Sequence, residues 1–160
     1  MTPLPPKNAR PLDEVDLRLL ALLQRDGRMP NNALADQLGI AQSTCLNRIR
    51  NLRRCGAIRG FHAEVDPAWV GRPIQAMIAV QIRSDARPAV SRFSGAIARH
   101  PAVLNVYFVS GSYDFLLHVA CSGPEDLRDF IATELSGKLQ VAGTETHLIF
   151  EHTRGASSGE

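Results

Sequence analysis

Two short amphipathic segments separated by three residues constrain the fold of this chain more than any other feature. They occupy residues 32–38 and 42–54. Gly39 follows the first segment directly, and a positive φ costs glycine little, so the chain can reverse there. Two helices joined by so short a turn form a helix-turn-helix. The spacing therefore predicts a unit whose second helix enters the major groove of double-stranded DNA.

Apolar residues at helical spacing predict the buried side of this unit. In the first segment they are Leu34, Ala35 and Leu38, and Ile40 fills the junction. In the second segment they are Cys45, Leu46, Ile49 and Leu52. A longer helix is predicted over residues 12–27, with Asp13 as its cap and Asp16 in a capping-box relation. We expect this helix to cover the back of the two shorter ones through Val15, Leu19, Leu20, Leu22 and Leu23.

The opposite side of residues 42–54 is polar and basic. Short hydrogen-bonding side chains lie near its start and arginines toward its end, and residues 42–60 contain five arginines and no acid. Amide and hydroxyl groups suit base edges, while arginines suit phosphates. A solvated helix face is the alternative, but this order of residue types favours DNA. The residues expected to contact DNA are Gln42, Ser43, Thr44, Asn47, Arg48, Arg50, Asn51 and Arg54.

Residues 57–65 alternate between apolar and polar side chains, which predicts a strand that acts as a wing or a linker. Arg59 lies on this strand. It is expected either to reach a flanking phosphate or to remain solvated. The N-terminal domain is therefore assigned to residues 12–66. It follows a tail at residues 1–11 that is rich in proline and polar residues, which predicts a flexible segment.

Charge and composition narrow the class of protein. Residues 1–66 carry ten Lys and Arg against seven Asp and Glu, and residues 67–160 carry eight against nine, so we expect the first part to bind the polyanion. No apolar run approaches the roughly 18 residues of a membrane span. We expect a cytoplasmic protein with no signal peptide and no membrane partner. The three cysteines form no CxxC pair, which argues against a disulfide framework and a zinc site. We expect no metal and no cofactor.

The hydrophobic period changes from helical to alternating after residues 67–73, and Pro and Gly in these residues predict a linker. We expect Trp69 to anchor this linker to the surface of a domain. Predicted strands occupy residues 74–82, 103–110, 115–121 and 141–152, and predicted helices begin at Pro88 and Pro124. This order is β-α-β-β-α-β. It is typical of a ferredoxin-like α+β sandwich, in which two helices cover one face of a four-stranded antiparallel sheet.

The second domain is assigned to residues 74–153, followed by a tail at residues 154–160. Met77 and Ala79 point to the face of the predicted sheet that the helices leave open. Such a face is too apolar to meet water over a whole sheet. We therefore expect it to contact a second copy of the chain in a homodimer.

Five segments, in order and across both domains, carry a resemblance to a known family. They read LDEVDLRLLALLQRDGR, LADQLGIAQSTCLNRIRNL, GAIRGFHAEVDP, VYFVSGSYDFLLHV and TETHLIFE. Over residues 12–152 the chain resembles the Lrp/AsnC family of feast/famine transcriptional regulators. The resemblance implies a winged helix-turn-helix joined to an amino-acid-sensing αβ sandwich. It also implies dimers built through the sandwich that assemble further into octameric discs.

The resemblance further implies an amino-acid effector held between dimers, near a Gly-x-x-Asp turn. Here the turn consists of Gly111, Ser112, Tyr113 and Asp114. A glycine turn exposes backbone N–H groups to a carboxylate, and an acid accepts bonds from an α-ammonium group. The positions that line the same cleft in the family are matched by Thr144, Thr146 and Leu148. The alternative is an ordinary hairpin turn whose Asp accepts bonds from local backbone donors.

The chain departs from the family at two helix starts. The family usually has Ser at the positions of Pro30 and Ala41. Neither Pro nor Ala has a side-chain oxygen that can accept from the first N–H groups of a helix. We therefore expect both short helices to begin without a side-chain cap.

Two rival functions belong to other classes. An enzyme is disfavoured because no Ser/His/Asp or Cys/His pairing is evident. The histidines are scattered, at His62, His100, His118, His147 and His152. An architectural DNA-binding protein without a functional effector site remains a rival to a regulator that responds to an amino acid.

Overall fold

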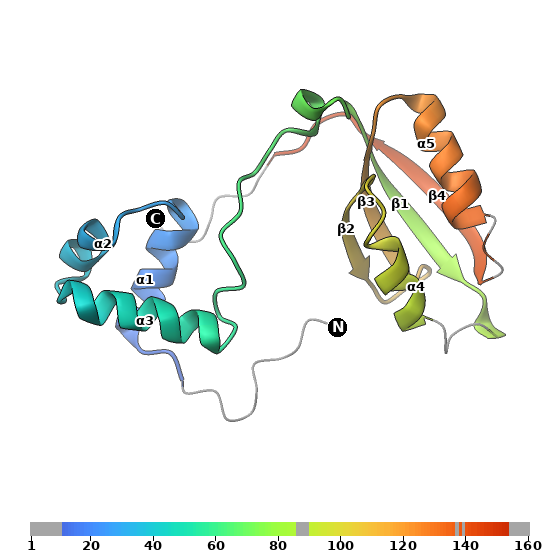
Figure 1. Cartoon of the computed structure of the whole chain (residues 1–160). Helices are drawn as coiled ribbons and strands as arrows, with labels where there is room; N and C mark the ends of the chain where they lie inside the picture. The colour runs from blue at the N-terminus through green and yellow to red at the C-terminus, as the bar shows by residue number, and fades with distance from the viewer. Residues whose placement is uncertain (1–10, 86–89, 137, 139, 154–160) are drawn as a thin grey trace. The chain divides into compact units, whose positions relative to one another are not determined.

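The computed structural model describes residues 11–85, 90–136, 138 and 140–153 (Figure 1). They form two compact units that divide between Glu64 and Val65. We call the described residues up to Glu64 the helical unit and Val65–His152 the sheet unit. Apart from Pro11, the tails expected at residues 1–11 and 154–160 lie outside the described residues, as does Pro88.

The helical unit contains three α-helices close to the positions that the sequence predicts. α1 spans Glu14–Arg25, α2 spans Asn31–Leu38 and α3 spans Gln42–Arg54. The predicted capping box is confirmed: the Asp13 carboxylate accepts the Asp16 N–H at 2.8 Å, and the Asp16 carboxylate accepts the Asp13 N–H. Gly39, with φ of 67°, ends α2 and allows the turn into α3.

The starts of α2 and α3 lack side-chain caps, as predicted. Neither Pro30 nor Ala41 makes a side-chain hydrogen bond to its helix. The two starts are instead joined to each other, because the Asn31 side-chain amide donates to the Gln42 carbonyl at 3.0 Å.

The core of the helical unit is formed by six buried side chains. They are Leu19, Leu34, Ala35, Leu38, Cys45 and Leu52. The prediction that Leu46 is buried is wrong, because its exposed fraction is 39%. Leu46 follows Cys45 by one residue, which turns it about 100° around the helix axis and out of the stripe that Cys45 and Leu52 define.

The wing strand predicted over residues 57–65 is also wrong, since this segment forms no strand. Its alternation of side chains satisfies only half of what a strand needs, because the backbone must also pair with a neighbour. The described residues of the helical unit offer no second strand. The segment is instead attached by the Ile58 N–H, which donates to the Leu52 carbonyl at 3.0 Å, and by the Phe61 ring beside Gly27.

The sheet unit has the predicted β-α-β-β-α-β order. Its elements are the 3-10 turn η1 (Pro67–Val70), β1 (Ile74–Ile82), α4 (Val90–Ile97), β2 (Val103–Phe108), β3 (Phe115–Cys121), α5 (Pro124–Phe130), the π-helical turn η3 (Ile131–Ser136) and β4 (Val141–Ile149). β2 and β4 end two and three residues earlier than the sequence predicted. The four strands form one antiparallel sheet in the order β2-β3-β1-β4.

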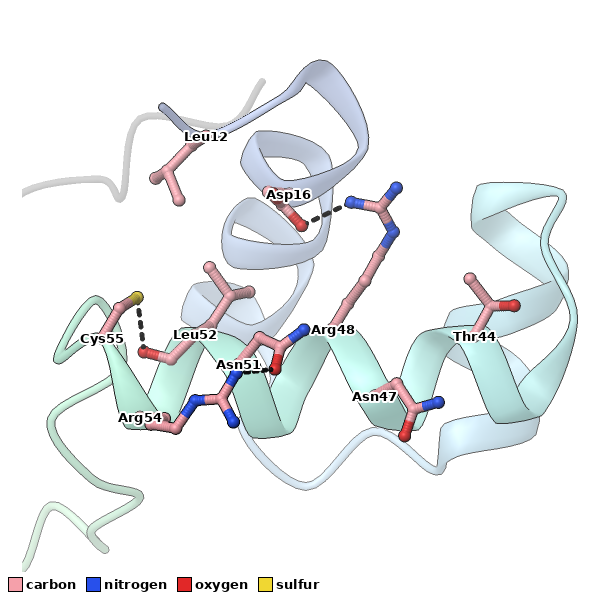
Figure 2. A pocket seen from close by; sticks show the side chains of 9 residues that line it. All are labelled: Leu12, Asp16, Thr44, Asn47, Arg48, Asn51, Leu52, Arg54 and Cys55. Atoms are coloured by element: carbon pink, nitrogen blue, oxygen red, sulfur yellow. Dashed lines mark hydrogen bonds and ion pairs between the residues drawn. The ribbon is translucent and has the colours of Figure 1, made fainter. Parts of the chain in front are cut away.

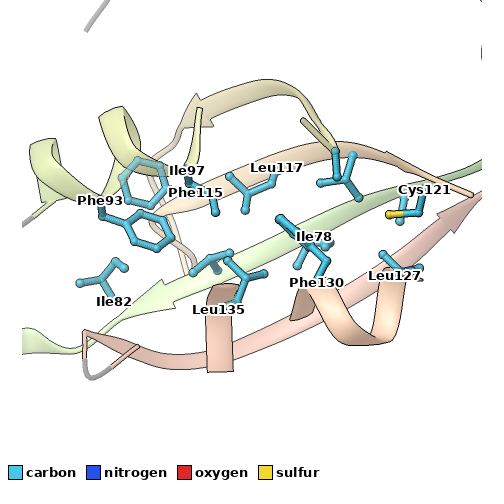
Figure 3. Packing of buried hydrophobic residues seen from close by; sticks show 14 residues of the cluster. Ile78, Ile82, Phe93, Ile97, Phe115, Leu117, Cys121, Leu127, Phe130 and Leu135 are labelled. Atoms are coloured by element: carbon cyan, nitrogen blue, oxygen red, sulfur yellow. The ribbon is translucent and has the colours of Figure 1, made fainter. Parts of the chain in front are cut away.

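The helices cover one face of this sheet (Figures 1 and 3). Strand residues on that face alternate as a half-buried strand requires. They are Ala76, Ile78, Val80 and Ile82 of β1 and Phe115, Leu117, Val119 and Cys121 of β3. Phe93 and Ile97 of α4, and Leu127 and Phe130 of α5, complete the packing together with Leu135 of η3.

The face without helices is less uniformly apolar than predicted. Met77 lies between His118 of β3 and His147 of β4 in the strand register. The His118 ring contacts Gln75 at 3.0 Å, and its burial, with repulsion from His152, lowers its pKa. We call this side, which also carries Leu116 and Ile149, the open face.

The missing cap of α3 gives a stability prediction. Ala41 has the extended conformation of an N-cap residue, with φ of −66° and ψ of 145°, so a serine there can accept from the first turn of α3. Ala41→Ser should raise the free energy of unfolding of the helical unit by about 1 kcal/mol, measured by chemical denaturation of the full chain monitored by circular dichroism. Ala57→Ser makes the same chemical change outside the helices and should have no such effect. Equal stability of the two variants would contradict the assignment of the helix start.

Candidate functional site

α3 presents a continuous polar stripe on the side opposite the core. Ser43, Asn47, Arg50 and Arg54 recur at intervals of four, three and four residues, so they share one side of the helix. All four are exposed. The stripe changes from short polar side chains to guanidinium groups along the helix. It can therefore meet base edges with one half and phosphates with the other.

Of the remaining predicted residues of α3, Thr44 and Asn51 flank this stripe, and Gln42 is the first residue of the helix. All three are exposed. The Arg54 guanidinium donates to the Asn51 amide oxygen at 2.9 Å (Figure 2). Arg59 is exposed on the extended segment that follows α3, beside Phe61 and His62.

Arg48 differs from the other predicted DNA-binding residues because its guanidinium is bonded within the protein. Its Nη1 lies 2.7 Å from Asp13 Oδ2 and 2.7 Å from Asp16 Oδ1. Hydrogen bonds to Asp13 and Asp16 raise the pKa of Arg48 above its ordinary value. Sequence reasoning missed both partners. A signal was present, since Arg48 lies three residues after Cys45 and four before Leu52, on the flank of the buried side.

A shallow hollow surrounds the Arg48 side chain (Figure 2). It is lined by Leu12, which precedes α1, by Asp16 of α1, and by Thr44, Asn47, Arg48, Asn51, Leu52, Arg54 and Cys55 on or next to α3. The hollow thus lies between the start of α1 and the polar side of α3. Asp16 is the buried member of this lining, since only 8% of its side chain is exposed.

The turn at residues 111–114 lies at the end of β1. Gly111 has φ of 122°, which favours glycine at this position. The Asp114 N–H donates to the Val80 carbonyl at 2.9 Å, and Asp114 Oδ2 accepts the Ile82 N–H at 2.8 Å. Asp114 therefore does satisfy a local backbone donor, as the ordinary-turn alternative predicts. Among the described residues, no hydrogen-bond donor reaches its Oδ1.

A polar hollow opens beside this turn. Its lining consists of Gln81, Ile82, Arg83, Ser84, Asp85, Gly111, Ser112, Asp114 and Ala142. Arg83 and Asp85 form an exposed ion pair at 3.0 Å, and the hydrogen bond from Arg83 lowers the pKa of Asp85. Sequence reasoning missed Arg83, Ser84 and Asp85, because their place beside the turn follows from the pairing of β1 and cannot be read from local spacing.

The other residues predicted for the effector lie away from this hollow. The Tyr113 hydroxyl donates to the Glu145 carboxylate, and this bond raises the pKa of Tyr113. On β4, Thr144, Thr146 and Leu148 lie opposite Val80, Ile78 and Ala76. All three point to the side of the sheet that the helices cover. From Thr144 to Thr146 and from Thr146 to Leu148, the distance from the turn grows by about 6.6 Å along the strand. Within one chain, the structure gathers Gly111, Ser112 and Asp114 but not the three residues of β4.

The part of the chain that the structure describes has neither a metal-ligand cluster nor a membrane-spanning helix. No group of three or more His, Cys, Asp or Glu side chains is placed there to hold a metal ion. None of the helices described is long and apolar enough to cross a membrane.

Both units match known protein families. Residues 12–53 match the AsnC-type helix-turn-helix domain, and residues 75–156 match the Lrp/AsnC ligand binding domain. The chain is 54% identical over 153 residues to the HTH-type transcriptional regulator AldR of Mycobacterium tuberculosis, which covers 94% of this chain and 86% of the relative.

Solved structures show the same fold. The crystal structure of MtbAldR has a TM-score of 0.78 at 49% identity and covers 91% of this chain and 99% of that chain. The structure of the transcriptional regulator NMB0573 from Neisseria meningitidis in complex with L-Met has a TM-score of 0.81 at 26% identity. That comparison covers 94% of this chain and 96% of that chain.

Proposed function

The chain belongs to the Lrp/AsnC family of transcriptional regulators, and we propose which of its residues bind DNA and which bind the amino-acid effector. As a member, it is a DNA-binding regulator with a ligand-binding domain. The observation that carries the DNA proposal is the stripe of Ser43, Asn47, Arg50 and Arg54, which is exposed on α3 opposite the core. Asn47 and Ser43 are assigned to base edges, and Arg50 and Arg54 to phosphates.

The effector proposal places a small amino acid in the hollow at the 111–114 turn. Asp114 Oδ1 is available to the α-ammonium group, while the turn N–H groups and Arg83 suit the carboxylate. The lining is mostly polar. The L-Met bound to the Neisseria meningitidis regulator supports an amino acid as the class of ligand. In this proposal Tyr113, Thr144, Thr146 and Leu148 contribute only where a second copy completes the cleft.

The proposal includes a homodimer formed through the open face, which assembles further into octamers as the family resemblance implies. Met77, Leu116 and Ile149 give that face apolar area that a second copy would cover. Trp69 supports association as well. It was expected to anchor the linker, but 88% of it is exposed. The proposed regulator works on DNA in the cytoplasm without catalysing a reaction, in keeping with relatives that are named as transcriptional regulators.

The DNA assignment predicts a change in salt dependence. Arg50→Ala should weaken binding to duplexes of every sequence and reduce the slope of log K against log salt by about one, since one phosphate contact is lost. Fluorescence anisotropy at several salt concentrations measures this slope. Asn47→Ala should change the preference between duplexes, and Arg25→Ala on α1 should change neither quantity. An Arg50→Ala variant with the wild-type slope would remove Arg50 from the interface.

The effector assignment predicts a loss of ligand binding in Asp114→Asn. Asparagine keeps an oxygen for the Ile82 N–H but removes the charge that binds an ammonium group. Calorimetry with each of the twenty amino acids, L-Met among them, should show binding to the wild type and none to Asp114→Asn, while DNA binding without ligand stays the same. Asp129→Asn, which removes an exposed carboxylate of α5, is the control. Normal binding by Asp114→Asn would leave Asp114 as a turn residue, and no binding by the wild type would favour the architectural alternative.

The dimer assignment predicts that Met77→Asp separates the subunits. A second copy that covers the open face would withdraw the new carboxylate from water, which costs several kcal/mol. Size-exclusion chromatography with light scattering at micromolar concentration measures the mass. Met77→Leu should assemble like the wild type. A monomeric wild type would refute the assignment.

A further inference from the structure

The Arg48 side chain points back from α3 toward the start of α1 (Figure 2). Its Nη1 donates to Asp13 Oδ1 at 2.8 Å, to Asp13 Oδ2 at 2.7 Å and to Asp16 Oδ1 at 2.7 Å. The same two carboxylates form the capping box of α1. A single polar network therefore joins the first turn of α1 to the middle of α3.

One charge of this network is buried and the other two are partly exposed. The exposed fraction of the side chain is 8% for Asp16, 24% for Arg48 and 40% for Asp13. A buried charge must remain paired, because the unpaired ion is strongly disfavoured. The arrangement therefore resists any movement of α3 that would separate Arg48 from Asp16.

The apolar core packs α3 against α1 and α2 without the angular requirement of a hydrogen bond. Apolar contacts have no preferred direction, whereas hydrogen bonds require defined angles. Leu46, on one flank of the buried stripe, is exposed, while Arg48, on the other flank, is fixed to α1. A roll of α3 by about 15° would move side-chain tips, about 5 Å from the axis, by more than 1 Å. A shift of that size breaks a hydrogen bond to a base edge.

We propose that Arg48, Asp13 and Asp16 are positioning residues that fix the rotation of α3 against α1, and so determine how well the exposed stripe of α3 reads a DNA sequence. The proposal rests on the proposed DNA binding by α3. It removes Arg48 from the residues that contact phosphate and adds two carboxylates that contact no DNA. It therefore assigns to Asp13 and Asp16 an effect on sequence specificity that their charge alone would not have.

Electrostatics by itself predicts the opposite effect of removing a carboxylate. DNA repels negative charge, so Asp16→Asn should strengthen binding to every duplex if charge alone matters. Under the proposal, Asp16→Asn weakens binding to the preferred duplex. The asparagine retains an oxygen for the Asp13 N–H, so the capping box is the feature least disturbed.

The test compares two duplexes of equal length. One is the duplex that the full wild-type chain selects from a random-sequence pool, and the other is its scrambled sequence. Affinities for both are measured over a range of salt for Asp16→Asn, Arg48→Met and the double variant. Asp36→Asn, which removes an exposed carboxylate of α2, and Arg50→Ala, which removes an exposed guanidinium of α3, are the matched controls.

The ratio of the two affinities should fall about tenfold in Asp16→Asn and in Arg48→Met, comparable with the loss of one matched base pair. The double variant should lose little more than Arg48→Met alone, because the Arg48–Asp16 bond is already absent in that variant. Arg48→Met should keep the wild-type salt slope. Asp36→Asn should leave the ratio unchanged.

Three results would overturn the proposal: an unchanged ratio in both single variants, stronger binding of Asp16→Asn to both duplexes, or a salt slope reduced by about one in Arg48→Met with equal losses on both. Circular dichroism and binding to the scrambled duplex check folding. If Arg48→Met unfolds, Asp16→Asn decides alone: a fall in the ratio supports the proposal, and an unchanged ratio refutes it. A wild type that selects no sequence would instead refute the DNA-binding proposal itself.

Discussion

The pairing of β1 with two neighbours is the constraint on which the sheet unit depends. Ile78 lies opposite both Leu117 of β3 and Thr146 of β4, so alternate residues of three strands must point to the same side. This register assigns one side to the helices and leaves the other open. It also brings the 111–114 turn to the end of β1, where Asp114 accepts the Ile82 N–H. The candidate effector hollow is therefore a product of strand order.

In the helical unit, a few hydrogen bonds orient helices that a small apolar core holds together. The core side chains bring α1, α2 and α3 together, but apolar contacts tolerate rotation. Asn31 ties the start of α2 to the carbonyl of Gln42, and Arg48 ties the middle of α3 to α1. These bonds act at separate points along α3. Together they hold a helix whose first turn has no side-chain cap.

Local chemistry predicted the fold well, and long-range pairing set the limit of the prediction. The period of apolar residues predicted α3, the capping residues predicted the start of α1, and alternation predicted β1 to the residue. Residues 57–65 alternate equally well, yet a strand also needs a partner. The partners of Arg48 lie 32 and 35 residues away, and Arg83 lies beside the turn only because of the sheet order. Neither the partners of Arg48 nor the position of Arg83 beside the turn can be inferred from the spacing of residues within one segment.

The hydrogen bond between Arg54 and Asn51 has a consequence for how a new DNA preference could evolve. Arg54, which we assign to a phosphate, and Asn51 each set the conformation in which the other meets DNA, so the two positions act as one unit. A substitution at either position changes how the other residue contributes to DNA specificity, so the effects of two substitutions on specificity do not add. The DNA preference at Asn51 and Arg54 therefore cannot be predicted by treating the two residues separately. Lineages that acquire a different preference here must pass through coupled changes.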